Sequence, residues 1–141
     1  MVKRKHKSTW RSGLEESVAK DLDKKKIYYE YEPSDGKIVY KVPAKESTYT
    51  PDFYVTTKSG KTLIIESKGI WDYDDRFKLL LIKQQYPDLD IRFVFQRSKS
   101  KIRKGSKTTY ADICRGDGRG PFKGITWPYA DKNIPREWLE E

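Results

Sequence analysis

The chain has 141 residues and a formal net charge of +9, from 30 lysines and arginines against 21 aspartates and glutamates, and a chain of this length usually forms one domain. Only 35% of its residues are apolar, but four Trp, ten Tyr and five Phe bury enough surface to exclude wholesale disorder. A single cysteine and a single histidine exclude an internal disulfide and an ordinary zinc site, and the longest aliphatic run, 79–82, is far too short to span a membrane.

The N-terminal half is predicted to contain a helix and then several strands. Residues 1–11 are a basic, flexible arm without an apolar pattern, and Ser12 is a typical N-cap for the helix that follows it. Residues 27–32 and 37–42 are aromatic and β-branched and are separated by a Pro-Ser-Asp-Gly turn signature. We therefore expect them to pair as a hairpin or as a long bent ribbon.

Two further strands, 52–57 and 61–67, are predicted to pair around a loop at 58–60. This register sets Asp52 opposite Glu66, and a slip of one residue would scramble the apolar face. The apolar side chains that the register gathers on one face are Phe53, Val55, Leu63 and Ile65.

The C-terminal half is predicted to contain three helices and one buried strand. The helices are expected at 72–85, from a cap at Thr108 or Thr109 through Cys114, and from Pro135 onward. The strand at 91–95 is a continuous apolar run, typical of a strand that is covered on both faces. Four glycines spread over 115–124 with charges between them, which predicts a mobile loop.

Charged residues on the polar face of the paired strands carry the candidate chemistry. Residues i and i+2 of a strand point to the same side, so Glu66 and Lys68 are neighbours, and the register brings Asp52 across to them. Two facing carboxylates repel unless a cation lies between them, and Mg²⁺ prefers oxygen ligands and accepts substrate phosphate. Asp52 and Glu66 are therefore candidate metal ligands, and Lys68 would orient or help to deprotonate the water that attacks phosphorus. The alternative is an exposed sheet face with ordinary charges, since 36% of the residues are charged.

Glu15 is a further acidic candidate with a strong structural alternative. The stretch from Ser12 to Glu15 has the pattern of a capping box, in which the Glu15 side chain would bond back to the Ser12 amide. The spacing alone favours that structural role.

Several stretches of sequence carry a family resemblance. The pairing of Pro51-Asp52 with Glu66-Ser67-Lys68 fits the PD-(D/E)xK nuclease motif. The wider set is RSGLE (11–15), YTPDF (49–53), ESKG (66–69), DDR (74–76), LDIR (89–92), KGS (104–106) and IPREW (134–138). In this order and spacing the chain closely resembles phage endonuclease I, the Holliday-junction resolvase family of podophages, over nearly its whole length.

The resemblance implies a fold and an activity. The fold would be α/β and restriction-endonuclease-like, with a mixed central sheet flanked by helices, in one nuclease domain over 12–141. The activity would be hydrolysis of phosphodiesters in four-way (Holliday) junctions and other branched DNA, with Mg²⁺ as the cofactor and Mn²⁺ as a substitute. Asp52 and Glu66 would be the metal ligands, Lys68 the catalytic lysine, and Glu15 an additional catalytic acid.

The resemblance also implies an intertwined, strand-exchanged homodimer. Residues 37–50 would bridge the two chains, and Glu15 of one chain would join Asp52, Glu66 and Lys68 of its partner. The glycine-rich segment 115–124 departs from the family pattern because it looks longer than the family's connection to the final IPREW-like stretch.

Basic residues independently point to a nucleic-acid substrate. Lysines and arginines bind phosphates without reading bases, so recognition of DNA structure rather than sequence is expected. Every second residue from 97 to 103 is basic, so an extended segment would present these side chains along one cationic edge. The alternative is that they only keep a tail or loop solvated. The candidate DNA-binding residues are Lys3, Arg4, Lys5, Lys7 and Arg11 in the arm, and Arg97, Lys99, Lys101, Arg103, Lys104 and Lys107.

Two other functions remain open from the sequence. One is a related PD-(D/E)xK nuclease that acts on another DNA structure, such as transposon ends, and the other is a non-catalytic junction-binding protein. A nucleotide cofactor is not expected, because Gly60-Lys61-Thr62 lacks the leading glycine of a P-loop. The basic N-terminus is not followed by an apolar stretch, so a cytoplasmic location is expected, in the host cell if the chain is phage-encoded.

Overall fold

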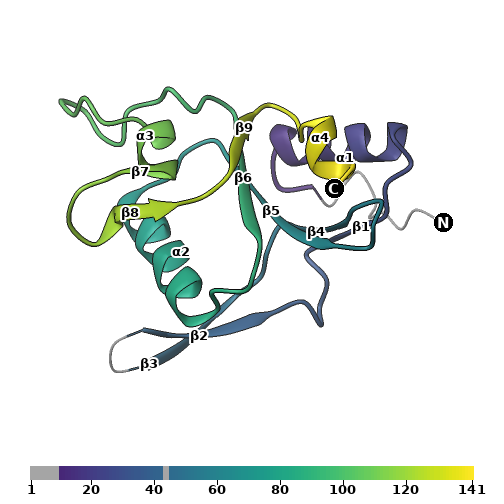
Figure 1. Ribbon diagram of the computed structural model, residues 1–141, viewed down its shortest axis with the longest axis horizontal. Coiled ribbons are helices and arrows are strands. Elements are labelled where there is room, and N and C mark those ends of the chain that lie inside the picture. The colour runs from purple at the N-terminus through teal and green to yellow at the C-terminus, as the bar shows by residue number, and fades with distance from the viewer. Residues whose placement is uncertain (1–9, 43–44) are drawn as a thin grey trace.

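A mixed five-stranded sheet forms the centre of the computed structural model, which describes residues 10–42 and 45–141 (Figure 1). In spatial order its strands are β1 (Tyr29–Tyr31), β4 (Phe53–Thr56), β5 (Thr62–Lys68), β6 (Ile91–Phe95) and β9 (Tyr129–Asp131). The pairs β1–β4 and β4–β5 are antiparallel, whereas β5–β6 and β6–β9 are parallel. The expected mixed central sheet flanked by helices is confirmed.

The β4–β5 hairpin has the register that the sequence predicts. Phe53 lies opposite Ile65 and Val55 opposite Leu63. The loop closes through a hydrogen bond from the Thr57 amide to the Lys61 carbonyl at 2.8 Å. The four apolar side chains of this face have no exposed surface, so each contributes roughly 1.5–3 kcal/mol by leaving water.

Helices cover the two faces of the sheet. On one face, α1 (Gly13–Lys24) packs Val18 and Leu22 against the apolar side of β4 and β5, and the Ser12 N-cap is confirmed. On the other face, α2 (Tyr73–Gln85) packs over a cluster of aromatic side chains from the loop before it and from β6. Three members of that cluster are Trp71, Phe93 and Phe95, all fully buried.

The predicted hairpin between residues 27–32 and 37–42 is wrong. β1 pairs with β4, at the edge of the central sheet. Tyr29 and Tyr31 are buried beside Phe53 in this arrangement, with ring centroids 5.8 Å and 5.3 Å from it. Burial of these two aromatic rings favours the long-range pairing over a local hairpin.

The following strand forms a separate hairpin with its own neighbour. β2 (Ile38–Val42) pairs with β3 (Lys45–Tyr49), and Figure 1 shows this hairpin apart from the central sheet, beside α2. A turn before β2 redirects the chain, because the Gly36 amide donates to the Pro33 carbonyl at 2.9 Å. Gln85 at the end of α2 bonds both the amide and the carbonyl of Lys41.

The C-terminal part is more ordered than the glycine pattern predicts. Residues 115–124 do not form an irregular loop, because two paired strands and a 3-10 turn lie within and just beyond them. Gly118 permits their close packing, since a Cβ there would lie 2.7 Å from the Cβ of Phe122. The elements of this part are α3 (Tyr110–Cys114), β7 (Arg115–Asp117), η2 (Gly120–Phe122), β8 (Lys123–Thr126) and α4 (Arg136–Leu139).

The helices are all short. Across residues 10–42 and 45–141, none is long and apolar enough to cross a membrane.

Candidate metal and catalytic site

Asp52 and Glu66 meet where β4 begins and β5 nears its end. Their exposed fractions are only 5% and 3%. The Asp52 amide donates to Glu66 Oε2 at 2.8 Å. The amide and hydroxyl of Ser67 both donate to Asp52 Oδ2, at 2.9 and 3.0 Å, so the middle residue of the Glu-Ser-Lys stretch fixes the aspartate. The sequence did not single out this positioning role of Ser67.

Lys68 completes the predicted trio. Its Nζ lies 3.5 Å from Glu66 Oε1 and 2.5 Å from Asp75 Oδ2. Asp75 comes from the first turn of α2, where its amide donates to the side chain of the N-cap Asp72. The short connection from β5 to α2 therefore brings the Asp75 carboxylate close to Lys68. The apolar patterns of β5 and α2 do not indicate this contact; only the short distance in sequence between the end of β5 and the start of α2 could have indicated it.

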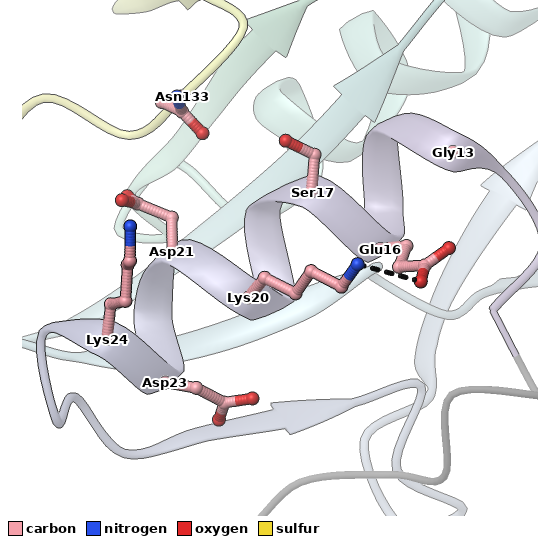
Figure 2. A pocket seen from close by; sticks show the side chains of 8 residues that line it. All are labelled: Gly13, Glu16, Ser17, Lys20, Asp21, Asp23, Lys24 and Asn133. Atoms are coloured by element: carbon pink, nitrogen blue, oxygen red, sulfur yellow. Dashed lines mark ion pairs between the residues drawn. The ribbon is translucent and has the colours of Figure 1, made fainter.

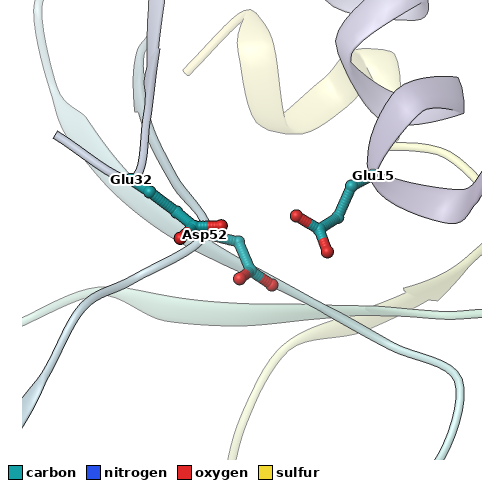
Figure 3. Close-up of side chains that lie close together, drawn as sticks. All are labelled: Glu15, Glu32 and Asp52. Atoms are coloured by element: carbon teal, nitrogen blue, oxygen red, sulfur yellow. The ribbon is translucent and has the colours of Figure 1, made fainter. Parts of the chain in front are cut away.

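Glu15 reaches the same site from the first turn of α1. Figure 3 shows its carboxylate directed toward Asp52. The carboxylate accepts hydrogen bonds from the Ser12 hydroxyl, at 3.2 Å, and from the Tyr31 hydroxyl. These two bonds replace the predicted bond to the Ser12 amide, because the Glu15 side chain turns inward to the site, where its exposed fraction is 6%.

Glu32 is a site residue that sequence reasoning missed. One carboxylate oxygen each from Glu15, Glu32 and Asp52 lie within 4.8 Å of one another (Figure 3). The Glu32 amide bonds the Asp52 carbonyl at 3.1 Å, as a continuation of the β1–β4 pairing. The sequence could have indicated Glu32 as a site residue, but only if β1 had been paired with β4 instead of with β2.

Arg11 lies in the site as well. Its Nε is 2.7 Å from Glu32 and its Nη2 is 3.2 Å from Asp52. The sequence placed Arg11 in the basic arm, and here it partly neutralises two carboxylates of the cluster. The arm residues Lys3, Arg4, Lys5 and Lys7 lie outside the described residues.

Burial makes the negative charge of this site unfavourable. Desolvation, followed by the charge of Asp52, raises the pKa of Glu66 to about 8. Burial also raises the pKa of Asp52 and of Glu15. Burial alone would lower the pKa of Lys68, but the carboxylates of Glu66 and Asp75 outweigh it and raise that pKa.

The residues present fit a hard divalent cation. Carboxylate oxygens are the ligands that Mg²⁺ and Mn²⁺ prefer, and a cation would relieve the repulsion that raises these pKa values. Asp52 belongs both to the predicted pair with Glu66 and to the group with Glu15 and Glu32. It is therefore the residue that the two candidate ligand sets share.

The second group of predicted DNA-binding residues is exposed, but its backbone differs from the expectation. Residues 97–107 form a series of turns instead of an extended strand, with the Ser100 amide on the Arg97 carbonyl and the Ser106 amide on the Arg103 carbonyl. An isolated bridge between Lys101 and Thr109 closes the loop. The exposed cations are Arg97, Lys99, Lys101, Arg103, Lys104 and Lys107.

A wide cavity lies away from this chemistry, along the solvent side of α1. Its volume is about 740 Å³, and charges of both signs line it (Figure 2). Lys20 pairs with Glu16 at 3.2 Å across one helical turn. Such pairs are typical of a solvated helix surface, and the cavity has no group of converging catalytic side chains.

Comparisons with known proteins agree with the resemblance in the sequence. The family profile of phage endonuclease I matches residues 1–141. Endonuclease I of Escherichia phage T7 is 45% identical over 132 residues, which cover 94% of this chain and 79% of the relative. Endodeoxyribonuclease 1 of Enterobacteria phage T3 is 43% identical over 132 residues, which cover 94% of this chain and 78% of the relative.

Proposed function

Because the chain belongs to the phage endonuclease I family and is a nuclease, we propose that it cleaves four-way (Holliday) junctions and other branched DNA with Mg²⁺. The strongest support is that Asp52, Glu66 and Lys68 lie close together at the open end of the β4–β5 hairpin, opposite its loop. Their chemistry suits hydrolysis of a phosphodiester, and the proposed fold is of the restriction-endonuclease type.

Asp52 and Glu66 are the proposed metal ligands. Mg²⁺, or Mn²⁺ in its place, would supply positive charge for the phosphoryl oxygens as negative charge develops on them. The raised pKa of Lys68 keeps its ammonium group protonated at neutral pH. Of the two predicted roles, a protonated Lys68 would therefore orient the attacking water rather than accept its proton, and Asp75 holds the ammonium group in place.

Glu15 is the proposed fourth catalytic residue. Its buried carboxylate lies beside Asp52, where it would bind the same cation or a second one. Tyr31 and Ser12 fix its orientation through their hydroxyl groups. The helix cap does not require these bonds to the Glu15 carboxylate, because the Ser12 hydroxyl already accepts a hydrogen bond from the Glu15 amide at 3.1 Å.

We further propose that the working form is a strand-exchanged homodimer bridged by residues 37–50. The β2–β3 hairpin is the connection between α1–β1 and β4–β5, and Pro43 lies outside the described residues. If the β2–β3 segment extended instead, the same contacts could form between two chains. Glu15 of one chain would then lie beside Asp52 of the partner, as it lies beside Asp52 within the described chain.

A mixed dimer tests this arrangement. Coexpression of a Glu15→Ala chain with a Lys68→Ala chain would place both losses in one composite site and leave the other complete. The purified mixed dimer should nick one strand of a junction without making the paired cut. A mixed dimer that forms and binds junctions but shows no nicking would mean that Glu15 acts within its own chain or only supports its helix.

The basic residues of the arm and of the 97–107 loop are the proposed DNA contacts. Phosphate contacts make binding strongly salt-dependent. Deletion of residues 1–7 should therefore weaken binding to every DNA form and flatten the dependence of affinity on salt. An unchanged dependence would remove the arm from the DNA-binding surface.

A cleavage assay tests the proposed function directly. A labelled four-way junction and a linear duplex of the same sequence are incubated with the protein, with Mg²⁺ or with EDTA. We expect Mg²⁺-dependent cleavage that favours the junction. Equal cleavage of the linear duplex would favour a nuclease for another DNA structure, and junction binding in EDTA without cleavage in Mg²⁺ would favour a non-catalytic binding protein.

A further inference from the structure

A second cavity, of about 560 Å³, lies between three segments that are distant in sequence. Its walls come from the first turns of α2, from the basic loop after β6, and from the glycine-rich segment around η2. We call this cavity the arginine pocket. The lining residues that matter here are Tyr73, Arg76, Arg103, Lys107, Arg119 and Phe122.

Four of these side chains are cationic. Within the described part of the chain, Arg76, Arg103, Lys107 and Arg119 form no ion pair within 4.0 Å. Some other described arginines do form ion pairs. Arg92, for example, lies 2.8 Å from Asp90 and 2.6 Å from Glu141.

Arg76 lies on the floor of the arginine pocket. It is 4% exposed, and its guanidinium donates to the Trp71 carbonyl. A guanidinium has five N–H donors, so most remain for a further acceptor. Burial lowers the pKa of Arg76, Tyr110 and the Asp72 carboxylate act in the opposite direction, and the charge of Arg103 lowers that pKa further. Two like charges converging in a cavity favour an anion between them.

The other wall of the pocket is aromatic. Tyr73 is 55% exposed and packs edge-on against Phe122, with ring centroids 6.0 Å apart. The Arg76 guanidinium carbon lies 5.7 Å from the centroid of the Tyr73 ring. An exposed ring beside a guanidinium suits a sugar or a base that is attached to the bound anion.

We propose that the arginine pocket binds a phosphodiester group of a DNA strand, with the adjoining sugar or base against Tyr73. Arg103, Lys107 and Arg119 are exposed at the rim, where a continuous strand can reach them, and Arg76 meets the phosphate from below. The inference deepens the proposed function, because it rests on DNA as the substrate.

The position of the pocket suits a contact near the point of cleavage. Tyr73 and Arg76 share the first turns of α2 with Asp75, which holds Lys68. A phosphate in the pocket would thus be fixed against the same helix that positions the catalytic lysine. Arg119 and Phe122 come from the glycine-rich segment 115–124, so the contact also depends on how that segment packs against α2.

Interference by neutral linkages provides the test. Single methylphosphonate linkages, which lack the phosphate charge, are placed in turn along a four-way junction and along a linear duplex. Affinity is measured in EDTA for the wild type and for an Arg103→Gln/Arg119→Gln double variant, in which both changes lie at exposed positions. Arg136→Gln, an exposed arginine on α4 at the opposite face, is the matched control. Arg76 is left intact because it is buried.

We expect the wild type and the control to lose affinity when particular linkages are neutral. The double variant should lose sensitivity at one of these positions and keep it at the others. Its slope of log affinity against log salt should fall by about 1, since each neutralised phosphate contributes about 0.9. A double variant that remains sensitive at every position would overturn the inference.

Inorganic pyrophosphate separates the pocket from a site for small anions. If pyrophosphate shifts the NMR signals of the arginine side chains while the double variant keeps the wild-type interference pattern, the pocket binds free phosphates and the DNA proposal is wrong. The proposed function is judged separately. Equal binding and cleavage of junction and duplex would count against junction selectivity, yet the interference pattern on the duplex would still decide the role of the pocket.

Discussion

The acidic site at the end of the β4–β5 hairpin and the arginine pocket are opposite in charge and differ in how their polar groups are satisfied. At the acidic site, Asp52 accepts two hydrogen bonds from Ser67, and Lys68 is held between two carboxylates. In the arginine pocket the cations have no carboxylate partner within the described residues, and Arg76 bonds one carbonyl. The side chains of the acidic site are thus held in place by the protein itself, whereas the cations of the arginine pocket would find their counter-charge in a bound anion.

This difference suggests separate tasks for the two regions. A preorganised set of buried carboxylates holds the positions of its oxygens, which favours chemistry on a bound cation. Exposed cations around a buried arginine favour binding of an anion. Changes at the first region should therefore reduce cleavage without removing binding, and changes at the second should reduce binding.

The largest effect is expected from loss of a metal ligand. Asp52→Asn and Glu66→Gln should each lower the rate of junction cleavage in Mg²⁺ by more than about 100-fold. Substitution of residues that merely support a metal ligand already lowers activity by up to about 100-fold. Junction binding should persist or tighten, because a negative charge facing phosphate is removed. Single-turnover rates and gel-shift affinities measure the two effects.

Asp88→Asn is the matched control for these variants. Asp88 is an exposed carboxylate on the loop after α2, and its neutralisation should change neither quantity. Mg²⁺-supported cleavage by Glu66→Gln at the wild-type rate would contradict the role of Glu66 as a ligand.

A smaller effect is expected at Glu32, and it would sharpen the boundary of the acidic site. Glu32→Gln removes one carboxylate of the group around Asp52 and the closer partner of Arg11. The Mg²⁺ concentration for half-maximal cleavage should rise by about 10-fold. Glu30→Gln, in β1 two residues before Glu32, is the control and should leave this concentration unchanged; equal effects of the two variants would place Glu32 outside the metal site.

The prediction at Glu32 also shows where sequence reasoning succeeds and fails. The register of Phe53 against Ile65 was predictable, because the apolar pattern and a short loop leave one good alignment. The pairing of β1 with β4 was not, because it depends on burial of Tyr29 and Tyr31 against residues distant in sequence. Glu32 was missed with that pairing.

The arginine pocket was out of reach of the sequence for a related reason. Arg103 and Lys107 were recognised as DNA-binding candidates from local charge alone. Arg76 looks like an ordinary helical residue, and the glycines around Arg119 predicted a mobile loop. Only the packing of η2 against α2 brings these cations together.

The smallest effect concerns the pH dependence of stability in the metal-free protein. The pKa of folded Glu66 is about 8, above its ordinary value of 4.5, so the folded state retains a proton that the unfolded state releases. Stability from this group is full below pH 4.5 and is lost as the pH rises through 8. The free energy of unfolding in EDTA should therefore fall by more than about 1 kcal/mol between pH 5 and pH 8.

Urea unfolding across this pH range measures the effect. Glu66→Gln should flatten the dependence, and Mg²⁺ should restore stability at pH 8, because a cation replaces the proton. A metal-free stability that rises with pH over this range would show that the buried carboxylates are not raised in pKa.

The proposed metal site is best tested by locating the cation in the protein. Crystals of the protein with Mn²⁺ give an anomalous signal that identifies the metal without reference to activity. We expect a Mn²⁺ ion in contact with carboxylate oxygens of both Asp52 and Glu66. An ion held by Glu15 and Glu32 without Glu66, or no ion at Asp52, would contradict it.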